Sequence, residues 1–307
     1  MFECYRSLFL YAVTPVHMGA GTALGLIDSP IQRERHTEFP MVSGSGLKGA
    51  IRHALSNDSE TRKTVERYFG PEAAGEDPGA GAVSLTDAQI VLYPVQNPRR
   101  AFSYVTSPLA LSRLGRLLHM AGISAPELSS LMVKEGEALV SSKAVLFNDR
   151  DLVLESLTFS VAVSDKALEA AEWLSAHALP AGESHSYFRE KIREGLVVLS
   201  DSDFSYLVRN TTSVEPHVRI DQESGTAEDG GLFYVENLPP ESLLVALAMS
   251  SRERPARKSN SRELSSAREV IQWLAEKLND LPLQIGGDAT TGRGQVLCHF
   301  EAGKEKA

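Results

Sequence analysis

Hydrophobic positions divide the chain into short apolar runs and a few segments with helical spacing. Runs of apolar or alternating residues predict β-strands. They lie at residues 8–13, 83–94, 157–163, 196–200 and 242–249, around Leu283, and at 295–300. Two further runs, 214–220 and 232–238, predict a hairpin with a long polar connection that contains glycine.

Apolar residues at a spacing of three or four predict helices in other parts of the chain. These segments are residues 47–55, 58–68, 108–120, 166–179 and 262–281. The last is the strongest, with Val270, Ile271, Leu274 and Leu278 on one face. Strands and helices follow one another without a regular βαβ rhythm, so the pattern favours an α+β fold over a doubly wound sheet.

Composition places the chain among soluble globular proteins, with 42% hydrophobic and 23% charged residues among 307. A net charge of −9 argues against indiscriminate nucleic-acid binding but is compatible with a localised basic face. Two cysteines, Cys4 and Cys298, are too few for a disulfide framework and favour a reducing, cytoplasmic setting. The apolar run at 8–13 is too short to span a bilayer, so no membrane association is expected.

Charge is distributed unevenly along the chain. Residues 252–268 hold six basic residues against two acids, and residues 221–241 hold six acids and no base. Each stretch fits either a solvated loop face or a contact surface. The segment 70–81 is rich in glycine, proline, alanine and acids, which predicts an excursion from the fold.

A glycine-dense segment near the N-terminus offers a place where backbone meets a phosphate chain. Six glycines between Gly19 and Gly49 let the main chain approach a ligand closely. The last of them enter a helical stretch, whose N-terminal amides and dipole suit an anion. Lys48 and Arg52 lie four residues apart on one face of that helix, and Asp28 precedes it in the loop.

The spacing Gly44-x-Gly46-x-x-Gly49 also matches the dinucleotide-binding fingerprint. The run before it is short and contains Pro40, and a polar helix follows where a second parallel strand is required. A nucleotide-cofactor enzyme therefore remains only as an alternative. A P-loop is excluded, because Gly49 follows Lys48 where serine or threonine is needed.

A second glycine-rich loop, residues 285–294, lies between the last two predicted strands. Its chemistry-bearing positions are Gly286, Gly287, Thr291, Gly292 and Arg293. One interpretation is a nest of amides that binds phosphate. The other is a turn that needs positive φ, and the local sequence does not separate the two.

His17 and Asp28 are candidates for RNA cleavage. A 2′-hydroxyl that attacks its own phosphate needs proton removal and charge stabilisation. An acid can help directly or by holding a divalent metal. The alternatives are a hydrogen-bonded structural histidine and a turn-forming aspartate. On the predicted hairpin, Phe233 or Tyr234 either stacks on a base or packs inward.

Blocks of sequence along nearly the whole chain resemble one known family. They are residues 14–21, 27–34, 39–52, 68–70, 85–88, 93–95, 219–221, 232–236, 238–239 and 285–294. The chain resembles the RAMP superfamily of CRISPR proteins and, more narrowly, the repeated backbone subunit of type III-B (Cmr) effector complexes. The most specific block is Asp-x-Pro-Ile-Gln-Arg at residues 28–33.

The resemblance implies a modified ferredoxin-like (RRM-type) palm formed by residues 1–213 and 239–307, with residues 214–238 as a β-hairpin thumb. It implies copies that stack as a filament along a crRNA together with other subunits of the effector complex. The thumb would flip bases out of the guide–target duplex, where stacking otherwise holds each 2′-oxygen out of line. An endoribonuclease activity would then cleave the target RNA at regular intervals.

The resemblance also implies site residues. Asp28 becomes the main catalytic candidate and the ligand of a divalent ion, Mg²⁺ or Mn²⁺, with His17 and Glu236 as further catalytic candidates. The implied RNA contacts are Gly19, Gly21, Arg33, Ser45, Lys48, Arg52, Arg219, Gly286, Gly287, Thr291, Gly292 and Arg293. Two alternatives stay open: a non-catalytic RNA-binding backbone subunit and the related type III-A backbone subunit.

Overall fold

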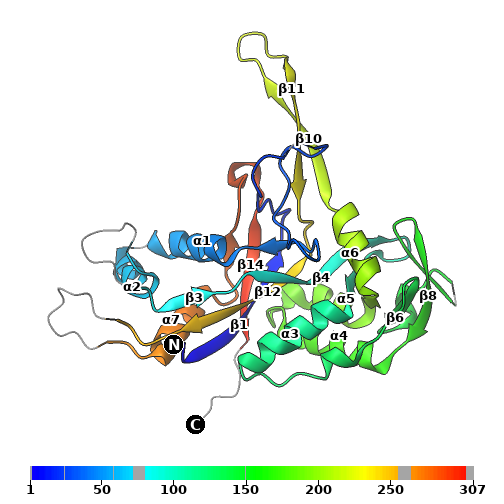
Figure 1. The fold of residues 1–307 in the computed structure, drawn as a ribbon, viewed down its shortest axis with the longest axis horizontal. Coiled ribbons are helices and arrows are strands. Elements are labelled where there is room, and N and C mark those ends of the chain that lie inside the picture. Colours follow the sequence, from blue (N-terminus) through cyan, green and yellow to red (C-terminus); the bar gives the residue numbers. More distant parts are fainter. Residues whose placement is uncertain are drawn as a thin grey trace.

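A computed structural model describes residues 2–23, 25–57, 59–71, 80–148, 150–254 and 264–301. Most of the predicted excursion at 70–81 and the central part of the basic stretch at 252–268 lie outside these residues. The described chain forms a body of sheet and helices, from which one hairpin projects (Figure 1). This hairpin is β10 (Ser213–Ile220) with β11 (Ala227–Asn237), so the predicted hairpin is confirmed.

The body is built on one large sheet. Its strands are β1 (Cys4–Ala12), β2 (Met41–Val42), β3 (Val83–Leu85), β4 (Ala88–Asn97), β5 (Ala101–Thr106), β6 (Glu137–Val140), β7 (Asp151–Leu154), β8 (Leu157–Val163), β9 (Leu196–Leu199), β12 (Leu243–Ser250), β13 (Pro282–Gln284) and β14 (Gln295–Glu301). Their order is β13-β14-β1-β12-β4-β5-β9-β6-β8-β7, with β2 on β4 and β3 on β12. The described pairs are antiparallel apart from β5 with β9 and β6 with β8. The protein is therefore a mixed α/β fold on a mostly antiparallel sheet.

Helices cover both faces of this sheet (Figure 1). They are α1 (Gly44–Ser56), α2 (Ser59–Phe69), α3 (Pro108–Met120), α4 (Asp165–His177), α5 (Ser186–Gly195), α6 (Asp201–Asn210) and α7 (Ala267–Leu278), with short turns η1 (Leu128–Ser130), η2 (Lys143–Val145), η3 (Glu183–His185) and η4 (Ala289–Thr291). Within the described ranges, none of the helices has the length and apolar character needed to cross a membrane.

The core explains why the central strands have continuous apolar sequences. Along β1, Leu8 and Leu10 join the cluster that contains α1, α2 and α7, whereas Phe9 and Tyr11 join the cluster that contains α3, α4 and α5. Successive side chains of a strand point to opposite faces, so a strand covered on both faces must be apolar at every position. β12 follows the same rule.

The start of α1 is held by groups of the protein itself. The Gly44 amide donates to Asp87 Oδ1 (2.7 Å), and the Gly46 amide donates to the Ser43 side chain (3.4 Å). A Cβ on Gly44 would lie 2.5 Å from the carbonyl oxygen of Leu85. The first glycine of the fingerprint-like spacing is thus required for close packing of the helix on the sheet.

We expect Gly44→Ala to lower the free energy of unfolding by about 1–3 kcal/mol, because the new methyl group meets backbone that cannot move aside. Denaturant unfolding of the full chain measures this loss. Gly49→Ala is the matched control. Gly49 lies in the same helix with no atom within 4 Å of a Cβ, so we expect a gain of about 0.5–1 kcal/mol. Equal denaturant midpoints of unfolding for the two variants would contradict the packing role of Gly44.

Glu241, between β11 and β12, combines a strained backbone with an unbonded carboxylate oxygen. Its φ is 70°, in the left-handed region. Its Oε2 is buried and has no hydrogen-bond partner among the described residues. Burial raises the pKa of this half-buried carboxyl to about 7. The native state therefore binds more protons than the unfolded chain between about pH 4.5 and 7.

As pH rises through this window, the folded state loses stability relative to the unfolded state, because the half-buried Glu241 carboxyl ionises less readily than an exposed one. We expect Glu241→Gln to be more stable than the unsubstituted protein at pH 8, by about 1 kcal/mol after discounting for partial exposure. The difference should vanish near pH 4.5. Denaturant unfolding at both values measures it, with the exposed Glu127→Gln as control. A difference that does not change with pH would show that the carboxyl keeps its usual pKa.

Candidate functional site

The outer edge of β11, opposite β10, organises the N-terminal loop. The Tyr234 amide donates to Asp28 Oδ2 (2.7 Å), and the Ser29 amide donates to the Tyr234 carbonyl (3.1 Å). Two residues further, the Glu236 amide donates to the Ser29 carbonyl (3.0 Å). The half-buried Asp28 is thus attached to the base of the hairpin, and its Oδ1 has no hydrogen-bond partner among the described residues.

His17 binds the same edge one ladder position away. Its Nδ1 lies 2.7 Å from the carbonyl oxygen of Glu236. A carbonyl only accepts, so Nδ1 carries the hydrogen and the neutral ring has its lone pair on Nε2. Residues 234 and 236, which anchor Asp28 and His17, lie about 7 Å apart along β11, since a strand rises 3.3–3.4 Å per residue.

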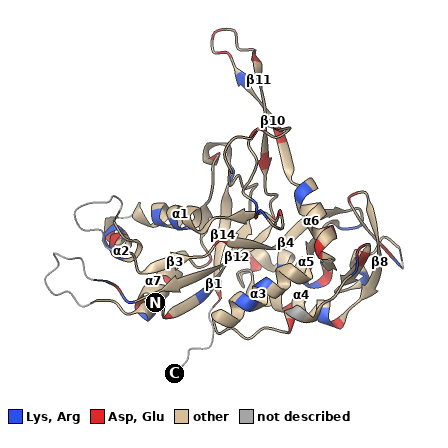
Figure 2. Ribbon diagram, in the orientation of Figure 1, with Lys and Arg blue, Asp and Glu red and all other residues tan. Residues whose placement is uncertain are grey.

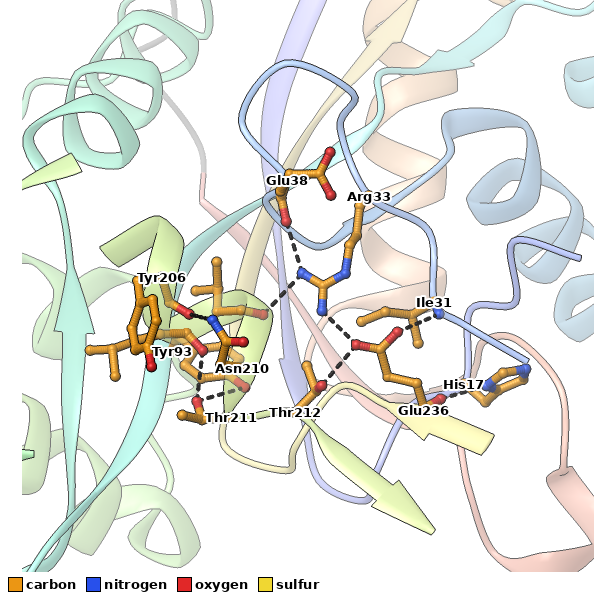
Figure 3. Close-up of polar contacts among 12 residues, drawn as sticks. His17, Ile31, Arg33, Glu38, Tyr93, Tyr206, Asn210, Thr211, Thr212 and Glu236 are labelled. Carbon is orange, nitrogen blue, oxygen red and sulfur yellow. Dashed lines mark hydrogen bonds and ion pairs between the residues drawn. The ribbon is translucent and has the colours of Figure 1, made fainter. Parts of the chain in front are cut away.

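The Glu236 side chain is a buried hub with 3% exposure. Its Oε2 accepts from the Ile31 amide (3.0 Å), and its Oε1 accepts from Arg33 Nη2 (2.5 Å) and the Thr212 hydroxyl (2.7 Å), as Figure 3 shows. Arg33 Nη1 also donates to two backbone carbonyls, at 2.8 and 2.9 Å. This pair joins the N-terminal loop, β11 and the end of α6.

The C-terminal glycine loop packs against the backbone of His17. The Gly287 amide donates to the His17 carbonyl (2.9 Å), and a Cβ on Gly286 would lie 2.2 Å from that oxygen. Gly286, Gly292 and Gly294 have φ values of 76°, 82° and 81°. The loop therefore has the positive φ values expected of a turn, and at Gly286 the close approach is to the protein itself. Phosphate binding by its amides stays a prediction.

Arg293 in this loop binds both carboxylate oxygens of Glu215 on β10, with Nη1 to Oε1 at 3.0 Å and a shorter contact between Nη2 and Oε2. The Arg293 side chain is only 11% exposed. Its hydrogen bonds hold the pKa of Glu215 below the usual value. Arg219, also on β10, is exposed, and the exposed Thr291 donates to the Asp288 carbonyl.

The α1 candidates have different contacts. Lys48 Nζ donates to the Val83 carbonyl (2.9 Å), and burial followed by the nearby Arg52 charge lowers the pKa of Lys48. Arg52 Nη1 donates to the Pro71 carbonyl (3.4 Å). These cations reach toward β3 and the end of α2. Ser45 is exposed at the start of α1.

The structure thus brings part of the predicted set together and leaves the rest elsewhere. His17, Asp28, Arg33, Glu236, Gly286, Gly287 and Arg293 surround the hairpin base, with Gly19 beside the His17 ring. Gly21 is exposed, with a φ of 96° and no atom within 4 Å of a Cβ. Figure 2 shows basic segments on α1 and α3 of the body and acidic segments on the hairpin.

Sequence reasoning missed Glu215, Thr212 and the backbone of Tyr234. Glu215 carries an acid at an alternating position of the predicted hairpin, which is the only signal it offered. The other two act through an amide or a single hydroxyl, which leave no pattern in a sequence. Within the described ranges, no group of three or more His, Cys, Asp or Glu side chains is placed to hold a metal ion.

Comparison with known proteins identifies the family. Residues 9–297 match the model of the RAMP superfamily, and the chain belongs to it. It is similar to CRISPR system Cmr endoribonuclease Cmr4 of Pyrococcus furiosus, with 34% identity over 293 residues, covering 94% of this chain and 92% of that protein. It is also similar to CRISPR system CMR subunit Cmr4 of Saccharolobus solfataricus, with 26% identity over 81% of this chain and 85% of that one.

A solved structure agrees with this assignment. The crystal structure of oligomeric Cmr4 from Pyrococcus furiosus superimposes with a TM-score of 0.74 at 27% identity, and the match covers 98% of this chain and 99% of that chain. The large sheet and the hairpin together therefore form one RAMP-type fold.

We expect Glu236→Ala to destabilise the protein by about 3–5 kcal/mol, because it leaves the Arg33 guanidinium buried without its counter-charge. Denaturant unfolding measures the change. Glu228→Ala, an exposed glutamate on the same strand, should change stability by less than about 0.5 kcal/mol. If both substitutions cost the same, the buried hub does not stabilise the hairpin base.

Proposed function

We propose that this chain is a repeated backbone subunit of a crRNA-guided type III-B CRISPR complex and that it cleaves target RNA. The observation that carries the proposal is the placement of Asp28 and His17 on one edge of β11, each with one unbonded polar atom. The 34% identity to a protein named as a Cmr endoribonuclease supports it over nearly the full length of both chains.

In this proposal residues 214–238 are the thumb, and residues 1–213 and 239–307 form a palm of modified ferredoxin-like (RRM-type) arrangement. The hairpin register supports a role in prying bases apart. Val218 pairs with Leu232 and Pro216 pairs with Tyr234, so these side chains share one face. Val218, Leu232 and Tyr234 are exposed, by 49%, 54% and 37%. An apolar and aromatic face suits contact with an unstacked base.

The proposed chemistry starts from a nucleotide splayed out of the guide–target duplex. Its 2′-oxygen can then attack the adjacent phosphorus in line, forming a 2′,3′-cyclic phosphate. The P–O5′ bond breaks, and the 5′-oxygen of the next nucleotide leaves with a proton from water. His17 Nε2 takes the proton of the 2′-hydroxyl, because the Glu236 carbonyl holds the ring in the tautomer with that lone pair. Because Gly19 and Gly287 lack side chains, the ring is accessible.

Asp28 is assigned the role of main catalytic residue through its free Oδ1. A single carboxylate is not a complete metal site, but Mg²⁺ keeps several waters and binds through one or two carboxylates together with substrate phosphates. We therefore assign Asp28 as the protein's ligand for Mg²⁺ or Mn²⁺ that enters with the RNA. The ion would supply positive charge at the phosphate.

Glu236 and Arg33 have other roles in this proposal than the family resemblance implied. The resemblance implied a catalytic role for Glu236 and an RNA contact for Arg33. Their buried contacts with each other and with the loop support positioning roles for both. Gly286, Gly287 and Arg293 contact other groups of the protein. Guide-backbone contacts are proposed for the remaining candidates, among which Gly21, Ser45, Arg219, Thr291 and Gly292 are exposed.

The partners in this proposal are crRNA, target RNA, further copies of the chain and other subunits of the effector complex. One observation favours a second function, a non-catalytic RNA-binding backbone subunit. Asp28 Oδ2 binds the Tyr234 amide, which is also the behaviour of a loop-anchoring aspartate.

Asp28→Asn separates these two functions, because an amide oxygen can keep the bond to the Tyr234 amide while the charge is lost. In the assembled complex we expect target cleavage to fall by at least about 100-fold, with guide and target affinity within about twofold. Gel analysis of labelled target under single-turnover conditions measures it, with Mg²⁺, with Mn²⁺ and with chelator.

Asp165→Asn, an exposed acid at the start of α4, is the matched control and should cleave normally. Cleavage by Asp28→Asn at the unsubstituted rate would remove Asp28 from the chemistry. Absence of cleavage by the unsubstituted complex under all three conditions would favour the non-catalytic function.

A further inference from the structure

Residues 15–17 behave as a short strand held between two neighbours. On one side, Val16 exchanges two backbone hydrogen bonds, both at 2.9 Å, with Leu238, which directly follows β11. On the other side, the Pro15 and His17 carbonyls accept from the Gly294 amide (2.8 Å) and the Gly287 amide (2.9 Å) of the glycine loop. The position of the His17 ring on β11 therefore depends on where the glycine loop lies.

The Arg293–Glu215 pair ties this loop to the far strand of the hairpin. Glu215 lies on β10, whereas residues 15–17 and the glycine loop lie on the other side of β11, so the pair reaches from this loop across the base of the hairpin. Both carboxylate oxygens of Glu215 bind the guanidinium. Such a bidentate pair has a defined geometry and fixes the two elements relative to each other.

These contacts also limit which other groups Arg293 can bind. Its two terminal nitrogens are bound to Glu215, its side chain is 11% exposed, and its backbone carbonyl accepts from Gln284 (2.9 Å). The pair and the low exposure leave little of the guanidinium open to a phosphate, and its buried Nε has no hydrogen-bond partner among the described residues. We propose that Glu215 is a positioning residue for His17, because its ion pair with Arg293 clamps the glycine loop against residues 15–17.

Loss of the Arg293–Glu215 pair would change the position of the His17 ring. Opening the clamp frees the loop, loosens the Gly287 bond to the His17 carbonyl and lets the imidazole leave the Glu236 carbonyl. A displacement of about 1 Å at a reacting group can cost about 100-fold in rate. The kinetic part of this inference rests on the proposed cleavage, whereas the placement of His17 does not.

The placement is tested on the full chain with ¹⁵N-labelled histidine, whose long-range ¹H–¹⁵N spectrum distinguishes the two neutral tautomers. His17→Gln assigns the signal. The unsubstituted chain should show His17 with hydrogen on Nδ1 only, and Glu215→Gln should give a tautomer mixture. The double variant Glu215→Arg with Arg293→Glu should restore the single tautomer, since it rebuilds the pair with reversed charges. Glu223→Gln, an exposed acid in the same hairpin, is the control.

The kinetic arm uses the assembled complex and target RNA. Glu215→Gln and Arg293→Gln should each slow single-turnover cleavage by about 10- to 100-fold with target affinity unchanged, and the double variant should recover most of the rate. A structural role alone would not predict this split between rate and affinity, nor the rescue.

Two results would overturn the inference. The first is an unchanged His17 tautomer in Glu215→Gln together with an unchanged rate. The second is an Arg293→Gln complex that loses RNA affinity with a smaller salt dependence, while charge reversal rescues nothing, because Arg293 would then contact phosphate. If the unsubstituted complex does not cleave but the tautomer responds as described, the clamp stands and the proposed cleavage fails.

Discussion

The outer edge of β11 is the constraint on which the rest of the candidate site depends. A strand at the edge of a ribbon presents unpaired amides and carbonyls, which must find partners. Here the partners are Asp28, Ser29 and His17, and Val16 binds Leu238 just after the strand, all from the N-terminal loop. The backbone amides and carbonyls of one strand therefore determine where the Asp28 and His17 side chains lie.

The buried contact between Glu236 and Arg33 adds specificity to this arrangement. Replacing one partner of a buried ion pair leaves an uncompensated charge, so the pair tolerates only one pairing of loop and strand. The carboxylate also binds the Ile31 amide and the Thr212 hydroxyl, which fixes its remaining oxygen lone pairs. The resulting hub links three elements whose residues lie far apart in the sequence.

Periodicity predicted the strongly patterned elements and missed several short strands and a charged helix. The helix at Pro108–Met120 and the strand at Leu157–Val163 have the predicted bounds, because their apolar spacing is regular. The strands β5, β6 and β7 and the charged helix α5 were missed, since few of their residues carry an apolar pattern of their own. For the site, glycine density and the block at 28–33 pointed to two loops that the structure brings together at the base of the hairpin. The Arg293–Glu215 contact was not predictable, because it joins two segments through tertiary packing alone.

The alternation of β11 separates the reach of the hairpin from the geometry at its base. Anchors sit at residues 234, 236 and 238, and a one-residue slip there would turn each anchoring group toward β10. From Leu232 toward the tip of the hairpin, the described contacts are those within the two-stranded ribbon. The distal ribbon can therefore change length in two-residue steps while Asp28 and His17 keep their positions at its base.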